Sequence, residues 1–219
     1  MAPKNQERRE TILATAYSLF GEASYDNVSL SDIARGAGIT KSLLQHYFPQ
    51  KIDIIKSMIT ELLNTSSSYI NTLGFTDTEI FQGISDFDML FFKGVSANYR
   101  LRRFMLCSVQ DPACLDVWVD TICRWLQRYY SENTFTYRQL KTALCFSMGG
   151  SMHLFMHQDE LDIDYRRYCR IHVGAILHLL GYKPELINQI LDLTDTRIDK
   201  IDTTAFLSYC EANISWITL

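Results

Sequence analysis

The sequence is poor in the residues that interrupt helices, and it lacks the common motifs of catalysis. Only 4 of its 219 residues are proline and 10 are glycine, which favours long helices over a turn-rich β fold. It contains no Gly-x-Ser-x-Gly, no P-loop and no dinucleotide-binding glycine pattern. We therefore expect an all-α protein that is not an enzyme, although a triad assembled from distant positions would leave no local motif.

Paired cysteines and long apolar runs are also missing. The first ten residues are polar, unlike a signal peptide, and no apolar run is long enough to span a membrane. None of the six cysteines has the Cys-x-x-Cys spacing of zinc and redox motifs. These absences predict a reduced, cytoplasmic protein without cofactors, in which the cysteines fill core space. The cysteines are Cys107, Cys114, Cys123, Cys145, Cys169 and Cys210.

The net charge of −4 is unevenly distributed. Up to Lys51 the chain has six Lys and Arg residues and five Asp and Glu residues, so this part carries +1 and the remainder −5. A slightly positive head on an acidic body is compatible with a local nucleic-acid contact, although the asymmetry is modest. The basic residues Lys4, Arg8 and Arg9 predict either an arm that follows DNA or a solvated tail, and we favour weak phosphate contact by Arg8 or Arg9.

Residues 29–48 predict two short helices around a glycine turn. Ser29 can cap the first helix, and Gly38 can adopt the positive φ that a tight turn requires. Thr40 can cap the second helix, which should end before Pro49 because the residue before a proline disfavours helical geometry. This is the spacing of a helix-turn-helix.

Helical periodicity continues on both sides of this motif. One helix is expected over residues 6–22 and a long one over residues 50–73. Further helices are predicted near residues 77–95, 99–109, 112–131, 136–158, 164–181, 184–193 and 203–217. We divide the chain into a head, residues 1–50, and a helical body for ligand binding and dimerisation, residues 51–219.

The stretch from Ile12 to Lys51 strongly resembles the DNA-binding domain of the TetR family of bacterial regulators. The matching runs are ILATAYSLF from Ile12, YDNVSLSDIA from Tyr25, AGITK from Ala37 and HYFP from His46, together with Leu44 and Lys51. Many positions agree at fixed spacing without a gap, although the match covers only about a fifth of the chain.

The resemblance implies a homodimer whose two heads bind a palindromic, double-stranded DNA operator. It also implies a helical body with a pocket for a small-molecule inducer. In this family, ligand binding tilts the long fourth helix and respaces the heads, which releases DNA. The predicted function is therefore that of a ligand-responsive repressor, released from its operator by a hydrophobic or aromatic small molecule.

The second helix of a helix-turn-helix enters the major groove. Lys41 can reach a guanine edge, Gln45 can pair with adenine, and Leu43 can contact a thymine methyl group. The full predicted DNA-binding set is Ser29, Thr40, Lys41, Ser42, Leu43, Gln45, His46, Tyr47 and Lys51.

Four members of this set, Ser29, Thr40, Tyr47 and Lys51, resemble phosphate-contact positions of the family. The first two have a second interpretation, as helix caps alone. Two other positions depart from the family, which often has threonine where Leu43 stands and tyrosine where Gln45 stands. We therefore expect an unusual operator.

The body is rich in aromatic residues and methionine, which at helical spacing usually form plain core. An inducer pocket would use part of this set together with a few polar anchors, and methionines suit adaptable walls. From helix placement we predict that the lining consists of Leu62, Ser66, Phe91, Trp118, Cys145, Met148 and Met152.

The helices near 136–158 and 164–181 are the predicted four-helix dimer interface. Gly149 and Gly150 lie in the middle of the first helix. Glycine there costs about 1 kcal/mol relative to alanine, so we expect a partner helix or a ligand to approach closely.

His153 and His157 are four positions apart and share a helix face near Asp159 and Glu160, so a metal site there is conceivable from the spacing. Surface or interface histidines are the commoner reading, and we assign no metal. One alternative function is a helical metal-binding or catalytic protein whose head docks a protein partner. Another is a DNA-binding regulator that responds to a protein rather than to a small molecule.

Overall fold

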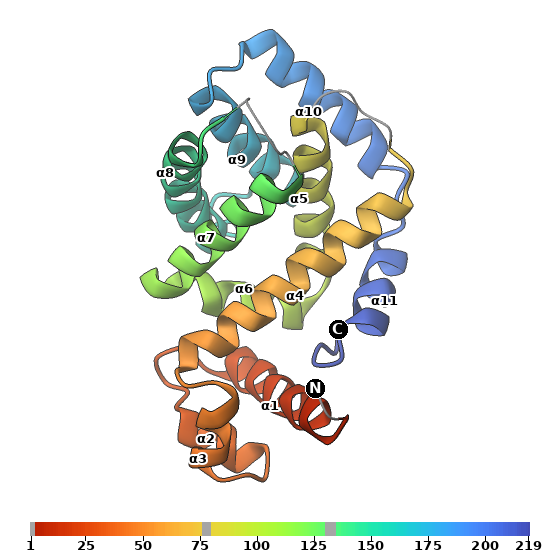
Figure 1. The fold of residues 1–219 in the computed structure, drawn as a ribbon. Helices are drawn as coiled ribbons and strands as arrows, with labels where there is room; N and C mark the ends of the chain where they lie inside the picture. Colours follow the sequence, from red (N-terminus) through yellow and green to blue (C-terminus); the bar gives the residue numbers. More distant parts are fainter. Residues whose placement is uncertain (1–2, 76–79, 130–134) are drawn as a thin grey trace. The chain divides into compact units, whose positions relative to one another are not determined.

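The computed structural model describes residues 3–75, 80–129 and 135–219, and its regular elements over these ranges are all helices. The all-α prediction is therefore confirmed. No helix among these residues is both long and apolar enough to cross a membrane. The helices are α1 (Pro3–Glu22), α2 (Leu30–Gly36), α3 (Lys41–Tyr47), α4 (Lys51–Thr72), α5 (Ile80–Ala97), α6 (Tyr99–Gln110), α7 (Pro112–Tyr129), α8 (Tyr137–Met156), α9 (Tyr165–Leu179), α10 (Pro184–Ile198) and α11 (Thr203–Asn213) (Figure 1).

Two predicted helix ends are wrong. The helix predicted to end at residue 193 continues to Ile198, which is buried and therefore keeps the last turn of α10 packed. The helix predicted to reach residue 217 ends at Asn213. The predicted start at residue 77 and end at residue 131 lie outside the described residues.

The chain divides into two compact units. The first comprises Met1–Thr65, Asn98–Trp118 and Leu207–Leu219, and the second comprises Ser66–Ala97 and Val119–Phe206. The first unit thus combines α1, α2 and α3 with α6 and the segment after α11. The functional division into residues 1–50 and 51–219 stays a prediction.

The core of the first unit joins α1 to residues from the far end of the sequence. Trp216 is 1% exposed, and its ring centroid lies 5.4 Å from that of Tyr17 in α1. The indole Nε1 donates to Glu61 Oε2 of α4 at 2.6 Å. Phe104 of α6 is also within ring contact, with its centroid 6.1 Å from that of Trp216. The segment after α11 is thereby part of the same core as the N-terminal helices.

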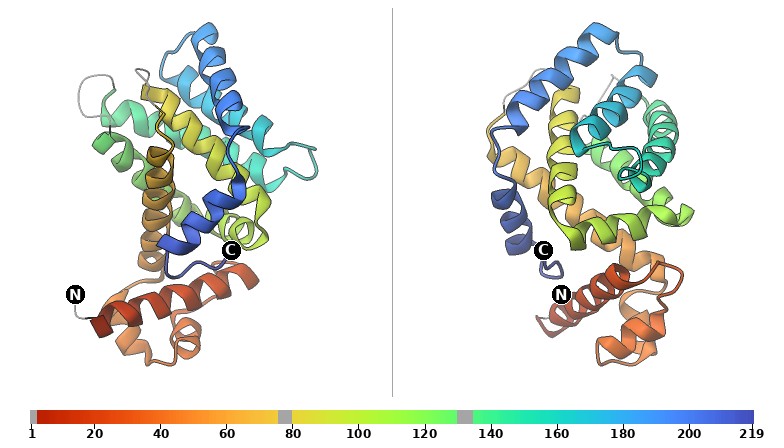
Figure 2. Two further views of the ribbon diagram at one scale, coloured as in Figure 1. Left: turned by 90° about the vertical axis from the view of Figure 1, so that its right-hand side faces the viewer. Right: turned by 180° about the vertical axis from the view of Figure 1, so that it is seen from behind.

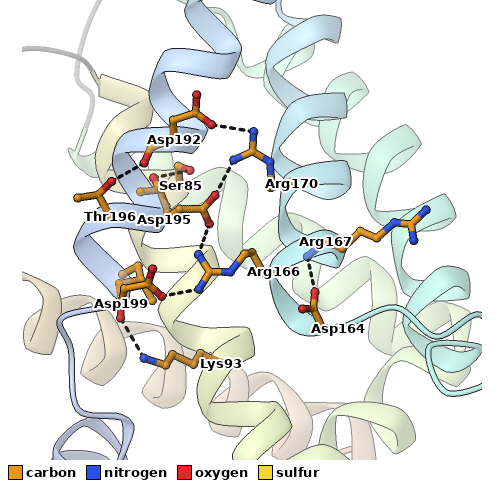
Figure 3. Close-up of polar contacts among 12 residues, drawn as sticks. Ser85, Lys93, Asp164, Arg166, Arg167, Arg170, Asp192, Asp195, Thr196 and Asp199 are labelled. Carbon is orange, nitrogen blue, oxygen red and sulfur yellow. Dashed lines mark hydrogen bonds and ion pairs between the residues drawn. The ribbon is translucent and has the colours of Figure 1, made fainter.

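In the second unit, α9 and α10 are joined by ion pairs (Figure 3). Arg166 of α9 pairs with Asp195 at 2.9 Å and also with Asp199. One turn further along, Arg170 reaches Asp195 at 2.6 Å and Asp192 at 2.9 Å. Two guanidinium groups therefore share one carboxylate, which fixes the register of the two helices.

A buried polar cluster joins α5 to α10. The Asp86 side chain is fully buried and accepts from Arg197 Nη1 at 2.8 Å. Thr194 Oγ1 lies 2.8 Å from the same carboxylate and 2.8 Å from Ser85 Oγ, and Gln82 Nε2 donates to Asp86 Oδ1 at 3.1 Å. Buried charge is tolerated here because each polar group has a partner.

The cysteine prediction is wrong at one position. Five cysteines are buried and none of the six forms a disulfide in the described structure, but Cys145 is exposed because it lies on the outward face of α8 beside Phe146. Burial raises the pKa of the Cys107 thiol to about 11 and that of the Cys123 thiol to about 11. Those two thiols are therefore protonated at neutral pH.

Candidate nucleic-acid interface

The first helix of the predicted motif begins at a reciprocal cap. Ser29 Oγ accepts from the backbone N–H of Asp32 at 3.1 Å, while the Asp32 carboxylate accepts from the backbone N–H of Ser29 at 3.1 Å and from its hydroxyl at 2.6 Å. The hydrogen bond from the Ser29 hydroxyl is the main reason that the pKa of Asp32 lies below its usual value, and the hydrogen bond from the Ser29 backbone N–H adds to the effect. The prediction that Ser29 caps α2 is confirmed, and its contact with phosphate stays a prediction.

The turn and the start of α3 also follow the sequence prediction. Gly38 has φ +66, the left-handed conformation that side chains disfavour. After the turn, the N–H of Ile39 donates to the carbonyl of Ala34 at 3.0 Å. Thr40 Oγ1 accepts from the N–H of Leu43 at 3.2 Å, which confirms Thr40 as the cap of α3.

One face of α3 is buried and the other is open. Leu44 is completely buried, and it holds the helix against the core of the first unit. The exposed residues are Lys41, Ser42, Gln45 and His46, while Leu43 and Tyr47 are half-buried. A short helix thus presents a cation, an amide, a hydroxyl and an imidazole outward, which are groups that hydrogen-bond to base edges and phosphates.

Lys51 has a structural role that the sequence did not indicate. Its ammonium donates to the carbonyl oxygens of Tyr25 at 2.5 Å and Val28 at 2.9 Å, and it lies 3.9 Å from the centroid of the Tyr25 ring. The ammonium therefore holds the loop that precedes α2. Because an ammonium has three donors, these two bonds leave one N–H for a phosphate, and that contact stays a prediction.

The predicted arm is partly anchored. Arg9 pairs with Glu61 at 2.8 Å and also donates to Ser57, both of α4. Tyr47 donates from its hydroxyl to Asn5 Oδ1 at 3.1 Å, which ties α3 to the start of α1. Of the two arginines proposed for phosphate contact, Arg8 is the one that is not held in an ion pair among the described residues.

The predicted ligand-lining residues are divided between the two units. In the first, Leu62 and Trp118 are buried, and the Trp118 indole donates to Ser108 Oγ at 3.0 Å. The members in the second unit are Ser66, Phe91, Met148 and Met152, which are buried, and Cys145, which is exposed. That these residues line one pocket stays a prediction.

His153 of α8 and His157, the residue that caps the end of this helix, lie side by side as predicted. The ring centroids of His153 and His157 are 4.7 Å apart, and His157 Nδ1 lies 3.0 Å from Glu160 Oε2. Within the described parts of the chain, no three His, Cys, Asp or Glu side chains gather as a metal site would require.

Comparison with known proteins bears on the same N-terminal residues. Residues 12–58 match the model of the family described as bacterial regulatory proteins, tetR family. The transcriptional regulator EthR of Mycobacterium tuberculosis is 31% identical over 71 residues, which cover 32% of this chain and 33% of EthR. EthR of Mycolicibacterium smegmatis is 35% identical over 66 residues, 30% of each chain. The matches thus span about a third of the length of these curated relatives.

Solved structures extend the likeness of the fold to most of the chain. RolR in complex with resorcinol superimposes with a TM-score of 0.57 at 17% identity, over 87% of this chain and 96% of RolR. TylP, a TetR regulator from Streptomyces fradiae, superimposes with a TM-score of 0.54 at 18% identity, over 88% of this chain and 97% of TylP. The head therefore has the sequence pattern of the tetR family of bacterial regulatory proteins, and the chain shares the fold of RolR and TylP.

Proposed function

We propose that this protein is a transcriptional repressor that binds a palindromic DNA operator as a homodimer and releases it when a hydrophobic or aromatic small molecule binds. The observation that carries the proposal is the exposed face of α3, where Lys41, Ser42, Gln45 and His46 stand on a helix fixed from behind by Leu44. The relatives that match the head are named transcriptional regulators.

Within this proposal, base reading and phosphate contact fall to different residues. Lys41 and Gln45 read base edges, and Leu43 contacts a thymine methyl group. Ser29, Thr40, Tyr47 and Lys51 meet phosphates, since the N-termini of helices present free N–H groups to anions. A good bidentate base contact contributes about 1–3 kcal/mol of discrimination.

The test selects an operator from random duplexes and measures affinity at several salt concentrations. We expect a steep fall in affinity with salt, because bound lysines and arginines displace counterions from DNA. Gln45→Ala should weaken binding about 5- to 150-fold and relax preference at one base pair. Lys41→Gln and Lys200→Gln remove the same charge at two places. We expect Lys41→Gln to weaken operator binding, and we expect Lys200→Gln in the second unit to leave it unchanged. Salt-independent binding, or equal affinities for these two variants, would contradict the proposal.

Homodimerisation is supported by the outward face of α8 and α9, which pack side by side in both further views (Figure 2). Phe146 is 72% exposed, and Ile171 and Leu179 of α9 are also exposed. A Cβ added at Gly149 or Gly150 would meet no heavy atom within 4 Å, so the chain itself does not supply the close approach expected there. A two-fold copy of the same face would cover these apolar side chains.

Light scattering during size-exclusion chromatography tests the dimer. Phe146→Glu places a charge in the proposed interface and should give a monomer that has lost operator binding. Leu193→Glu makes the same kind of change at an exposed leucine of α10, and we expect that variant to remain dimeric. If Phe146→Glu and Leu193→Glu have the same mass in solution, the proposed dimer interface is wrong.

Ligand binding is supported by buried polar atoms in the second unit. Ser66 Oγ, Asp88 Oδ2 and His172 Nδ1 are buried without a hydrogen-bond partner among the described residues. Burial raises the pKa of Asp88, while the nearby His172 opposes the rise. Such groups in apolar surroundings are the anchors that a small polar substituent on a hydrophobic ligand uses.

Resorcinol, the ligand named in the RolR complex, is a suitable first probe because it is an aromatic ring with two hydroxyl groups. We expect it to lower operator affinity and to bind less tightly to Asp88→Ala and Met148→Ala. If operator affinity is unaffected by resorcinol and by a panel of substituted aromatics, the inducer part of the proposal is wrong and the DNA-binding part stands.

A further inference from the structure

A cavity of about 310 Å³ lies within the first unit, between α1, α6 and the segment after α11. Tyr17 and Gly21 of α1 form one wall, Arg100 and Arg103 of α6 another, and Trp216 a third. None of the residues predicted to line the inducer pocket contributes to it. The cavity is therefore a different place from the ligand site of the proposed function.

Two guanidinium groups at this cavity have no counter-ion in the part of the chain that the structure describes. Arg103 donates from Nε to the carbonyl oxygen of Gly21 at 3.1 Å, which fixes its position and leaves its terminal nitrogens available. Among the described residues, Arg100 hydrogen-bonds only to the carbonyl of Thr218, at 3.5 Å. Neither arginine forms an ion pair with a carboxylate of the described residues, and the one carboxylate in the lining, Glu22, is exposed. The lining thus carries a net positive charge.

Tyr17, which lines the cavity, has a buried hydroxyl group without a partner among the described residues. Tyr17 is 5% exposed, and its hydroxyl has no hydrogen bond among the described residues. Its ring packs against Phe104, with centroids 5.6 Å apart, and against Trp216. Burial raises the pKa of Tyr17, so the hydroxyl keeps its proton at neutral pH. An unsatisfied buried hydroxyl is destabilising, and a ligand atom in the cavity would relieve that penalty.

We propose that this cavity binds a small aromatic carboxylate, with its ring against Tyr17 and Trp216 and its carboxylate between Arg100 and Arg103. Arginine forks bind carboxylates through paired, charge-assisted hydrogen bonds, and aromatic walls favour a flat ring. The volume is at the lower end of the range for small-molecule pockets, so it admits one or two fused rings.

A ligand in this position contacts α1, which belongs to the candidate DNA-binding head, together with α6 and the segment that contains Trp216. It binds only while these three elements are packed as described, and it therefore stabilises that packing by mass action. The site is a second effector site, and its ligand need not resemble the inducer.

Isothermal titration calorimetry on the full chain tests this with indole-3-carboxylate as the probe. The neutral indole-3-carboxamide has the same shape without the charge, and we expect it to bind at least about tenfold more weakly. Arg103→Gln should lower the affinity for the acid by a similar factor. Arg124→Gln, an exposed arginine of the second unit, should leave the affinity unchanged.

A blocking variant locates the site. A Cβ at Gly21 would meet no heavy atom within 4 Å, so Gly21→Leu can fold with its side chain in the cavity, and we expect it to abolish binding. Circular dichroism checks that it has folded. If Gly21→Leu does not fold, Tyr17→Phe is used in its place. This variant keeps the ring and removes only the hydroxyl, and it should lower the affinity for the acid several-fold.

The proposal is overturned if the acid fails to bind at about 1 mM, or if acid and amide bind equally. The proposal is also overturned if the acid binds to folded Gly21→Leu as tightly as to the unmodified protein, because the ligand would then lie elsewhere. If Gly21→Leu does not fold, undiminished binding to Tyr17→Phe overturns it instead. Operator binding without ligand is measured in parallel, so failure of this site and failure of DNA binding give different results.

Discussion

Asp86 allows a direct test of what holds the second unit together. Its side chain is fully buried and receives hydrogen bonds from Arg197 and Gln82, with Thr194 Oγ1 at 2.8 Å. Asp86→Ala removes one acceptor from three polar groups at once. It also removes the carboxylate that pairs with the guanidinium of Arg197, which is only 17% exposed.

The size of the effect follows from that burial. Breaking a buried ion pair by removing one partner costs about 3–5 kcal/mol. At about 2–4 °C per kcal/mol for a chain of this size, the melting temperature should fall by roughly 6–20 °C. Asp192→Ala is the matched control, because this carboxylate on α10 also pairs with an arginine, at 2.9 Å, but is 70% exposed. Exposed pairs contribute about 0–1 kcal/mol.

Urea unfolding followed by circular dichroism measures both variants. The reasoning is refuted if Asp86→Ala loses less than about 1 kcal/mol, or no more than Asp192→Ala. A further check combines Asp86→Ala with Arg197→Met. If the loss arises mainly at the guanidinium of Arg197, the double variant should be more stable than Asp86→Ala alone.

Three further outcomes are expected. Gly38→Ala should destabilise the protein by about 1–2 kcal/mol, because its φ of +66 is strained for a side chain; an unchanged melting curve would argue against that conformation. The monomeric Phe146→Glu variant at pH 8 should react with one equivalent of a thiol reagent at Cys145, and adding Cys145→Ser should abolish this rapid reaction, since burial keeps thiols such as Cys107 protonated. Trp216→Phe should cost about 1.5–3 kcal/mol in urea unfolding, because it removes the indole donor to Glu61, and an unchanged unfolding curve would contradict this role of the hydrogen bond.

The local chemistry of the head was predictable from sequence. Ser29 and Thr40 are caps, Gly38 has positive φ, and α3 ends before Pro49. Each of these depends on one residue and its immediate neighbours in sequence, so propensity and spacing are sufficient.

Long-range pairings were not predictable. Nothing in the sequence near Lys51 indicates that its ammonium binds the carbonyls of residues 25 and 28. Likewise, Arg9 was read as part of an arm because its partner Glu61 lies on another helix. Periodicity identifies which face of a helix is buried, but it does not identify the element that covers it. The cavity at Tyr17 was missed for this reason, since its walls come from three separated segments.

The packing of Trp216 against α1 and α4 has a consequence for synthesis. Glu61 and its indole partner are 155 positions apart, and ribosomes add about 5–20 residues per second. For roughly 8–30 s, therefore, a nascent chain has made the N-terminal helices but not the residue that covers Tyr17. During that interval the aromatic surface of α1 is open to chaperones, and the first unit closes only when translation has delivered Trp216.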